Sequence, residues 1–152
     1  MAYAVTLHLL AALIWVGGMF FAYMALRPAV VETLEPPQRL RLWVNTFKRF
    51  FLWVWLSIIL LMATGYWMVL SVFGGFDAAG THIHIMHVLG WIMVLIYMHV
   101  FFAPYRRMRH AVITEDFPTA ADNLSKLRKL VALNLCLGLT VITVASAGRY
   151  LG

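Results

Sequence analysis

Four long stretches without a charged residue constrain this chain more than any other feature. They cover residues 1–26, 50–76, 78–105 and 130–148. Each one reaches or approaches the roughly 20 apolar residues that an α-helix needs to cross about 30 Å of hydrocarbon. None of them has the polar stripe that a helix of a soluble bundle turns toward water. The sequence therefore predicts an all-α integral membrane protein.

The composition also indicates that most of the chain is surrounded by lipid. Of the 152 residues, 63% are hydrophobic and only 12% are charged. A soluble domain of this length leaves roughly a third of its unfolded-chain surface exposed, and this chain has too few charges to cover such a surface. We expect one domain, residues 1–152, folded as an up-down four-helix bundle with helices near 3–27, 49–72, 82–104 and 127–148.

The basic residues are confined to two of the three predicted loops. Eleven of the twelve Lys and Arg side chains lie there. They are Arg27, Arg39, Arg41, Lys48 and Arg49 in the first loop, and Arg106, Arg107, Arg109, Lys126, Arg128 and Lys129 in the third. The link at 71–81 has none, so the positive-inside rule predicts cytoplasmic first and third loops and both termini outside. This topology accounts for the net charge of +6. We therefore expect membrane lipid as the partner of the basic residues, and no nucleic acid.

Histidines within the predicted spans are the candidate functional residues, because an ionisable ring in a membrane is costly without a partner. His8 lies in the first span, and His84 and His87 lie in the third, all roughly 5–9 Å below the outer boundary. In an up-down bundle these two helices are diagonal and face each other across the core. Two facing imidazoles suit the iron of haem b, and there is no motif for covalent haem attachment.

A helical projection separates the two candidate ligands in the third span. One stripe contains His84, Val88, Trp91, Leu95, Met98 and Phe102, while His87 lies about 60° to one side. We therefore expect His8 and His84 to be the axial ligands, with His87 as the close substitute.

Other residues are expected beside the cofactor or deeper in the bundle. Trp15 and Gly18 belong to a small-residue notch that lets a helix or a flat macrocycle approach, and Trp91 lies on the His84 stripe. His99 is about 20 Å from His84 along the helix axis, too far to bind the same iron. We predict that His99 accepts a proton when a quinol or porphyrinogen is oxidised, or else bonds to a group such as Asn134.

Two simpler readings compete with haem. Any single histidine in a membrane helix can be no more than a hydrogen-bonding residue. The chain also has nine methionines, whose soft thioethers together with the His-x-His-x-x-His pattern at 82–87 can bind copper.

Short patterns spread along most of the chain resemble the small bacterial CopD-like proteins, named for copper resistance. They are LHLL at 7–10, WVGGMF at 15–20, RP at 27–28, EPP at 35–37, TGYWM at 64–68 and HVFFAPYRR at 99–107. More distantly, His8, Trp15, Gly18 and Arg27 in the first helix, and His99 with Arg106-Arg107 in the third, are similar to the HemJ-type protoporphyrinogen oxidases. The first resemblance implies copper handling, and the second implies haem b and porphyrinogen oxidation.

The leading hypothesis from the sequence is a haem b protein of the bacterial inner membrane with a redox or electron-transfer role. Its partner would be quinone, superoxide or a porphyrinogen, and it would act as a haem-dependent oxidoreductase. The alternative is a CopD-like protein that binds or transports copper. The sequence leaves the oligomeric state open.

Overall fold

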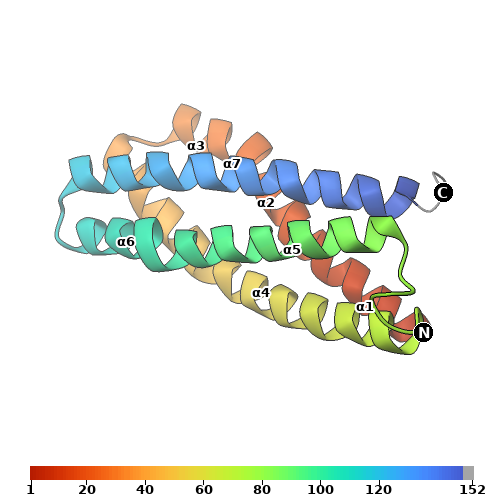
Figure 1. Cartoon of the computed structure of the whole chain (residues 1–152). Helices are drawn as coiled ribbons and strands as arrows, with labels where there is room; N and C mark the ends of the chain where they lie inside the picture. Colours follow the sequence, from red (N-terminus) through yellow and green to blue (C-terminus); the bar gives the residue numbers. More distant parts are fainter. Residues whose placement is uncertain (149–152) are drawn as a thin grey trace.

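The structure, a computed structural model that describes residues 1–148, consists of four long helices joined by short connections (Figure 1). The first long helix runs through α1 (Ala2–Ala12), η1 (Leu13–Gly17), α2 (Gly18–Phe21), η2 (Ala22–Leu26) and α3 (Arg27–Thr33). The second is α4 (Pro36–Ser71), and the fourth is α7 (Phe117–Ala147). The third runs through α5 (Thr81–Val100), η3 (Phe101–Tyr105) and α6 (Arg106–Ile113). The η segments are π-helical turns. All four helices are long and apolar enough to cross a membrane, which confirms the predicted fold class.

The helices are longer than the sequence predicted. The expected loops at 28–48 and 105–126 are mostly helical, and the connections that remain are residues 34–35 and 114–116. A run of Arg and Lys marks where hydrocarbon ends rather than where a helix ends, because both residues favour helix. The actual starts carry ordinary signals: Pro36 opens α4, and the Asp116 side chain accepts a hydrogen bond of 3.2 Å from the Thr119 backbone N–H.

Two prolines lie within the long helices and do not end them. Pro28 is the second residue of α3, just after the π-helical turn η2, and Pro104 lies inside the π-helical turn η3. Proline in a regular α-helix loses a hydrogen bond and clashes with the preceding turn. A π-helical turn is wider, so it accommodates the proline ring while the chain continues in the same direction.

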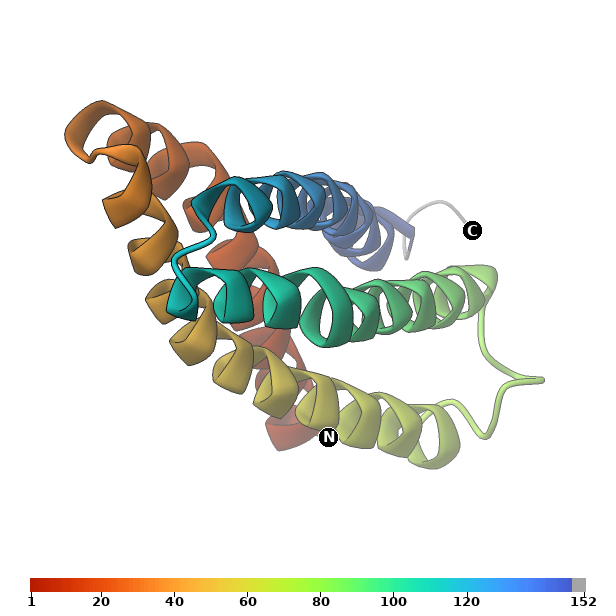
Figure 2. The same cartoon turned by 90° about the vertical axis from the view of Figure 1, so that its left-hand side faces the viewer.

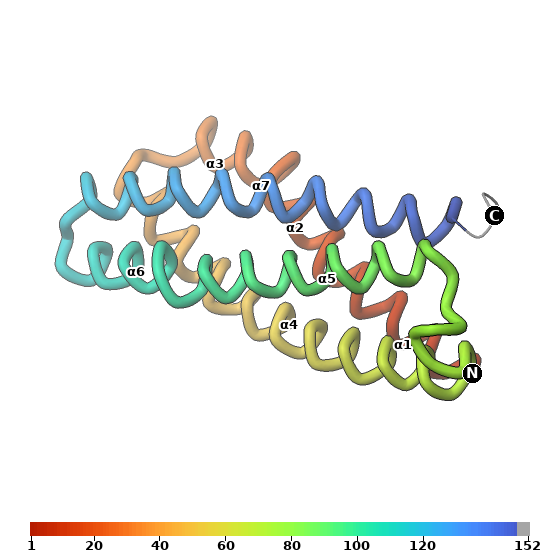
Figure 3. The backbone as a smooth tube through the Cα atoms, in the orientation of Figure 1, coloured from red at the N-terminus to blue at the C-terminus, as the bar shows by residue number. Residues whose placement is uncertain are grey.

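The four helices pack as two pairs. α1 lies against α4, and α5 lies against α7. The first helix crosses the bundle obliquely, so η1 and α2 reach α7, and the first and third helices are diagonal to each other. Figures 1 and 2 show that the two pairs diverge toward the end that holds the N-terminus and the 72–80 connection, and Figure 3 traces the same path along the backbone.

A column of aromatic side chains joins α4 to the third helix in the other half of the bundle. We call Trp43, Phe47, Phe51, Tyr97 and Tyr105 the aromatic column. Successive ring centroids lie 5.0 Å apart for Trp43 and Phe47, and 5.2 Å apart for Phe47 and Phe51. Phe51 then meets Tyr97 at 5.4 Å and Tyr105 at 4.9 Å. The Tyr97 hydroxyl also donates to the Phe51 carbonyl oxygen at 3.0 Å, so the column is both packed and hydrogen-bonded.

The topology predicts that the ends of the bundle lie on opposite sides of the membrane. The native cysteine, Cys136, is first replaced by Ala. Thr33→Cys and Ala78→Cys are then made separately, both at exposed positions in or next to connections at opposite ends. An impermeant maleimide added to intact cells should label the Ala78→Cys protein and not the Thr33→Cys protein, because the basic residues cluster at the Thr33 end.

Permeabilised cells provide the control, since both introduced thiols should then react. Equal labelling of the two variants in intact cells would contradict the four-span topology.

Candidate functional site

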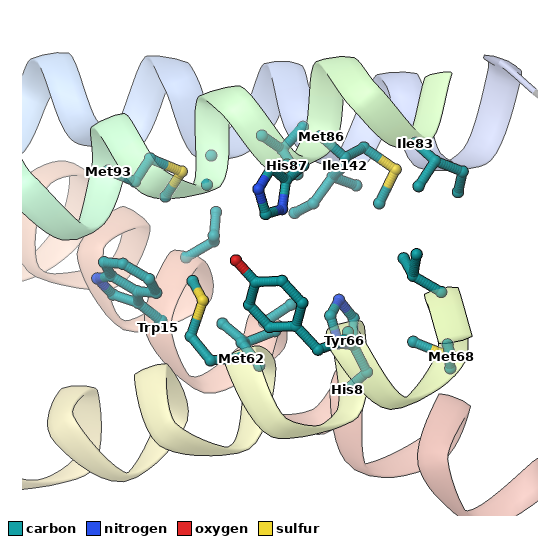
Figure 4. Close-up of a pocket in the computed structure, with 18 of the residues that line it drawn as sticks. His8, Trp15, Met62, Tyr66, Met68, Ile83, Met86, His87, Met93 and Ile142 are labelled. Carbon is teal, nitrogen blue, oxygen red and sulfur yellow. The ribbon is translucent and has the colours of Figure 1, made fainter. Parts of the chain in front are cut away.

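A cavity of about 170 Å³ lies where the two helix pairs diverge. Residues from all four helices line it, and Figure 4 shows its interior. The lining side chains whose nitrogen, oxygen or sulfur could offer a lone pair to a metal ion are His8, Met62, Tyr66, Met68, Met86, His87 and Met93. Among the described residues, no carboxylate lines this cavity.

His8 enters the cavity from α1 and is anchored to α4. Its Nδ1 atom lies 2.8 Å from the Thr64 hydroxyl oxygen. The ring packs over Gly65, where an added Cβ would lie 3.4 Å from the ring's Cε1 atom. The glycine therefore leaves room for the imidazole beside the helix, while the neighbouring threonine supplies its polar contact.

His87 enters the same cavity from α5, on the opposite side from His8 (Figure 4). Its ring meets Tyr66 edge-on at a centroid distance of 5.4 Å, and Phe76 at 5.0 Å. The Trp91 indole N–H donates to the Tyr66 hydroxyl oxygen at 3.1 Å. Since that oxygen accepts from Trp91, the hydroxyl proton of Tyr66 is available to the cavity, toward which the hydroxyl points in Figure 4.

Four methionines contribute thioether sulfurs to the lining. Met62 and Met68 come from α4, and Met86 and Met93 come from α5. Figure 4 shows them distributed around the two imidazoles. Thioether and imidazole are ligands that suit copper(I), and the flexible Met side chain adapts readily to a bound ion.

The connection at 72–80 covers one end of the cavity. Its residues Phe73 and Phe76 line the wall. Gly74 and Gly75 have φ values of +76° and +111°, and the Gly75 N–H bonds back to the Val69 carbonyl at 2.9 Å. Glycine tolerates these positive angles, so the chain turns sharply and brings Phe76 over His87.

Trp15 forms the opposite wall. It lies in the π-helical turn η1, is buried, and packs edge-on against Tyr97 at 6.1 Å. Beyond it lies a second cavity of about 20 Å³, which Trp15 and Asn134 both line. Asn134 is 3% exposed, and its Oδ1 atom has no hydrogen-bond partner within residues 1–148. That volume is enough for one water molecule.

The structure places the two candidate histidines of the third helix differently with respect to the cavity. The stripe that carries His84 is exposed, with Val88 at 58% and Leu95 at 61%. His84 does not line the cavity, whereas His87 does. A projection shows which residues share a stripe, but in an all-apolar span no polar face indicates which stripe meets lipid.

Three other predicted residues also lie away from the cavity interior. His99 is on the exposed face of α5 and makes no side-chain hydrogen bond to the described part of the chain, so the expected contact with Asn134 is not formed. Gly18 faces the Phe50 ring and serves the packing of α2 on α4. Trp91 is exposed and reaches the cavity only through Tyr66.

The polar residues of α4 at the site were not predicted from the sequence. Gly65 and Tyr66 line the cavity from α4, together with Met62 and Met68, and Thr64 contacts His8 next to this wall. A signal was present, because Thr64 and Tyr66 are polar residues in an otherwise apolar span, where such side chains bond across helices.

The donor set favours a soft metal over a hard one. Within residues 1–148 no group of three or more His, Cys, Asp or Glu side chains is arranged to hold a metal ion. A site here must combine the two imidazoles with thioethers. Haem b would need more space, since 170 Å³ is below the roughly 300–1,000 Å³ of typical small-molecule pockets.

Comparison with known proteins agrees with the copper alternative better than with haem. A family model described as copper resistance protein D matches residues 44–147, which include His87, Thr64 and the four cavity methionines. No curated protein and no solved structure gives a match. The matched region covers more than half of the chain, which is therefore a multi-pass membrane protein that belongs to the CopD (copper resistance protein D) family.

Proposed function

We propose that this protein binds copper(I) as its cargo in the cavity between the two helix pairs. The observation that carries the proposal is that His8, His87 and four methionines line one cavity. The family match provides independent support, because copper resistance requires a protein that recognises the ion.

The chemistry of the lining argues for copper(I) in particular. Soft thioether ligands select copper(I), and imidazole binds copper well. Hard ions such as Mg²⁺ and Ca²⁺ prefer oxygen ligands, especially carboxylates, and the lining formed by the described residues has none. A monovalent ion also introduces less charge into the low-dielectric interior than a divalent one.

The position of the cavity suggests which compartment supplies the copper. The cavity lies at the end of the bundle next to the 72–80 connection, opposite the end that carries eleven of the twelve Lys and Arg residues. By the positive-inside rule the cavity end faces the periplasm of a bacterial inner membrane. Copper would therefore enter from the periplasmic side, beside the 72–80 connection.

The haem b hypothesis, with quinone, superoxide or a porphyrinogen as electron partner, has less support. The cavity is small for a macrocycle, and His99, the expected proton acceptor, lies on the exposed face of α5. A copper site needs no separation of the helices, since its donors already face one space.

Removal of either cavity histidine should weaken copper binding. His8→Ala and His87→Ala should each lower copper(I) affinity by at least about 100-fold, because loss of a ligand should cost no less than loss of the residue that orients it. Affinity is measured in detergent by competition with a chromophoric copper(I) chelator under reducing conditions.

His84→Ala and His99→Ala are matched controls, since they remove the same side chain from exposed positions on the same helix. They should bind copper like the wild type. A purified protein that is red, with a Soret band lost in His8→Ala, would contradict the copper proposal and support haem b.

The methionines should determine the preference for copper(I). Met62→Leu combined with Met93→Leu should lower copper(I) affinity by about tenfold and reduce the copper–sulfur signal in X-ray absorption, because Leu keeps the volume and removes the sulfur. Met24→Leu with Met98→Leu, at exposed positions outside the cavity, is the control. An unchanged sulfur signal in the cavity variant would show that the thioethers do not bind the ion.

A further inference from the structure

The contact between His8 and Thr64 determines where the protons lie. The Thr64 hydroxyl oxygen is 2.8 Å from His8 Nδ1 and 2.5 Å from the backbone carbonyl oxygen of Leu60. A threonine hydroxyl has one proton to donate, and a carbonyl oxygen can only accept. The single hydroxyl proton must therefore serve one of these two contacts.

The contact with Leu60 requires that proton. Without a proton between them, the Thr64 hydroxyl oxygen and the Leu60 carbonyl oxygen would repel each other through their lone pairs at 2.5 Å. That distance is one at which two oxygen atoms share a hydrogen bond. The Thr64 hydroxyl therefore donates to Leu60 and accepts from His8. For His8 to donate, Nδ1 must carry a proton.

We infer that Thr64 is a positioning residue that holds His8 as the Nδ1–H tautomer and so makes Nε2 the atom that binds copper. This inference rests on the proposed copper function for the role of Nε2, and on geometry alone for the tautomer. In a neutral imidazole only one nitrogen carries a proton, so Nε2 keeps its lone pair. Histidine ligands of metals usually donate their other N–H to an acceptor in this way, which fixes the ring and raises its basicity.

The surroundings of His8 keep the ring in this orientation. A Cβ at position 65 would lie in van der Waals contact with the ring, 3.4 Å from Cε1, so a side chain larger than alanine would extend into the space beside the ring. The Thr64 hydroxyl is itself held by the helix carbonyl one turn earlier. Because Thr64 is fixed on α4, its hydrogen bond orients the His8 ring on α1 before a metal ion binds.

The first test needs no variant of Thr64. Protein labelled with ¹⁵N-histidine, free of copper, is studied in nanodiscs by NMR, with His8→Gln used to assign the His8 signals. We expect the shifts of a neutral ring protonated at Nδ1 and unprotonated at Nε2. A ring protonated at Nε2 would overturn the inference, whatever the protein binds.

The second test uses Thr64→Val, which keeps the shape and removes the hydroxyl, and Thr64→Ser, which restores it. Thr64→Val should release the tautomer preference and lower copper(I) affinity by about 10–100-fold. Thr64→Ser should return both to near wild type. Thr140→Val is the matched control, because its hydroxyl also bonds the carbonyl four residues earlier, at 2.9 Å to Cys136, but meets no histidine among the described residues.

The outcomes separate this inference from the proposed function. Wild-type tautomer and affinity in Thr64→Val would overturn the positioning role of Thr64. An Nδ1–H tautomer in a wild type that binds no copper would overturn the proposed function and the ligand role of Nε2, and would confirm the hydrogen-bond assignment.

Discussion

The aromatic column is the contact on which the rest of the bundle depends. Helices in lipid gain no hydrophobic energy from meeting each other, so packing and hydrogen bonds must hold them together. Stacked and edge-on rings, each pair worth about 0.5–1.5 kcal/mol, fasten α4 to the third helix in the basic half, with the Tyr97 hydroxyl bonded to the Phe51 carbonyl. Because the helices are held there, they are free to diverge in the other half, and the cavity lies in that space.

As a proposed copper site, the cavity would hold a cation in lipid without permanent charges in its lining. The candidate donors among the described residues are imidazole and thioether side chains rather than carboxylates, which are costly to bury. Each imidazole is also associated with a residue of α4. His8 contacts Thr64, and His87 meets Tyr66, whose oxygen is in turn bonded by Trp91. The second helix thus contributes two of the four cavity methionines and contacts both histidines.

The placement of His84 outside the cavity lining shows where periodicity stops being informative. His84 and His87 differ by about 60° on the helix, and both lie in a span whose residues are nearly all apolar. In water, the polar side of an amphipathic helix identifies the face that is exposed. In lipid both faces are apolar, so the packing between helices determines which face is buried. Met93, Val94 and Tyr97 are buried in the bundle, and this rotation of α5 places His87 toward the cavity and His84 away from it. Thr64 was overlooked for a related reason, since its importance lies in a contact with a residue 56 positions earlier.

The sequence by itself determined that the chain is a four-helix membrane protein. The length of the uncharged segments and the positions of the basic residues are local properties, and they decide which segments cross the membrane. It also singled out His8 as a candidate ligand and gave copper as the alternative to haem, through the histidines, methionines and family patterns. Only the tertiary structure decided which histidine on the third helix lines the cavity with His8, that the helices continue through Pro28 and Pro104, that Thr64 contacts His8, and that four methionines line one cavity. These outcomes depend on the rotation and divergence of whole helices, which result from side-chain packing between segments far apart in the chain.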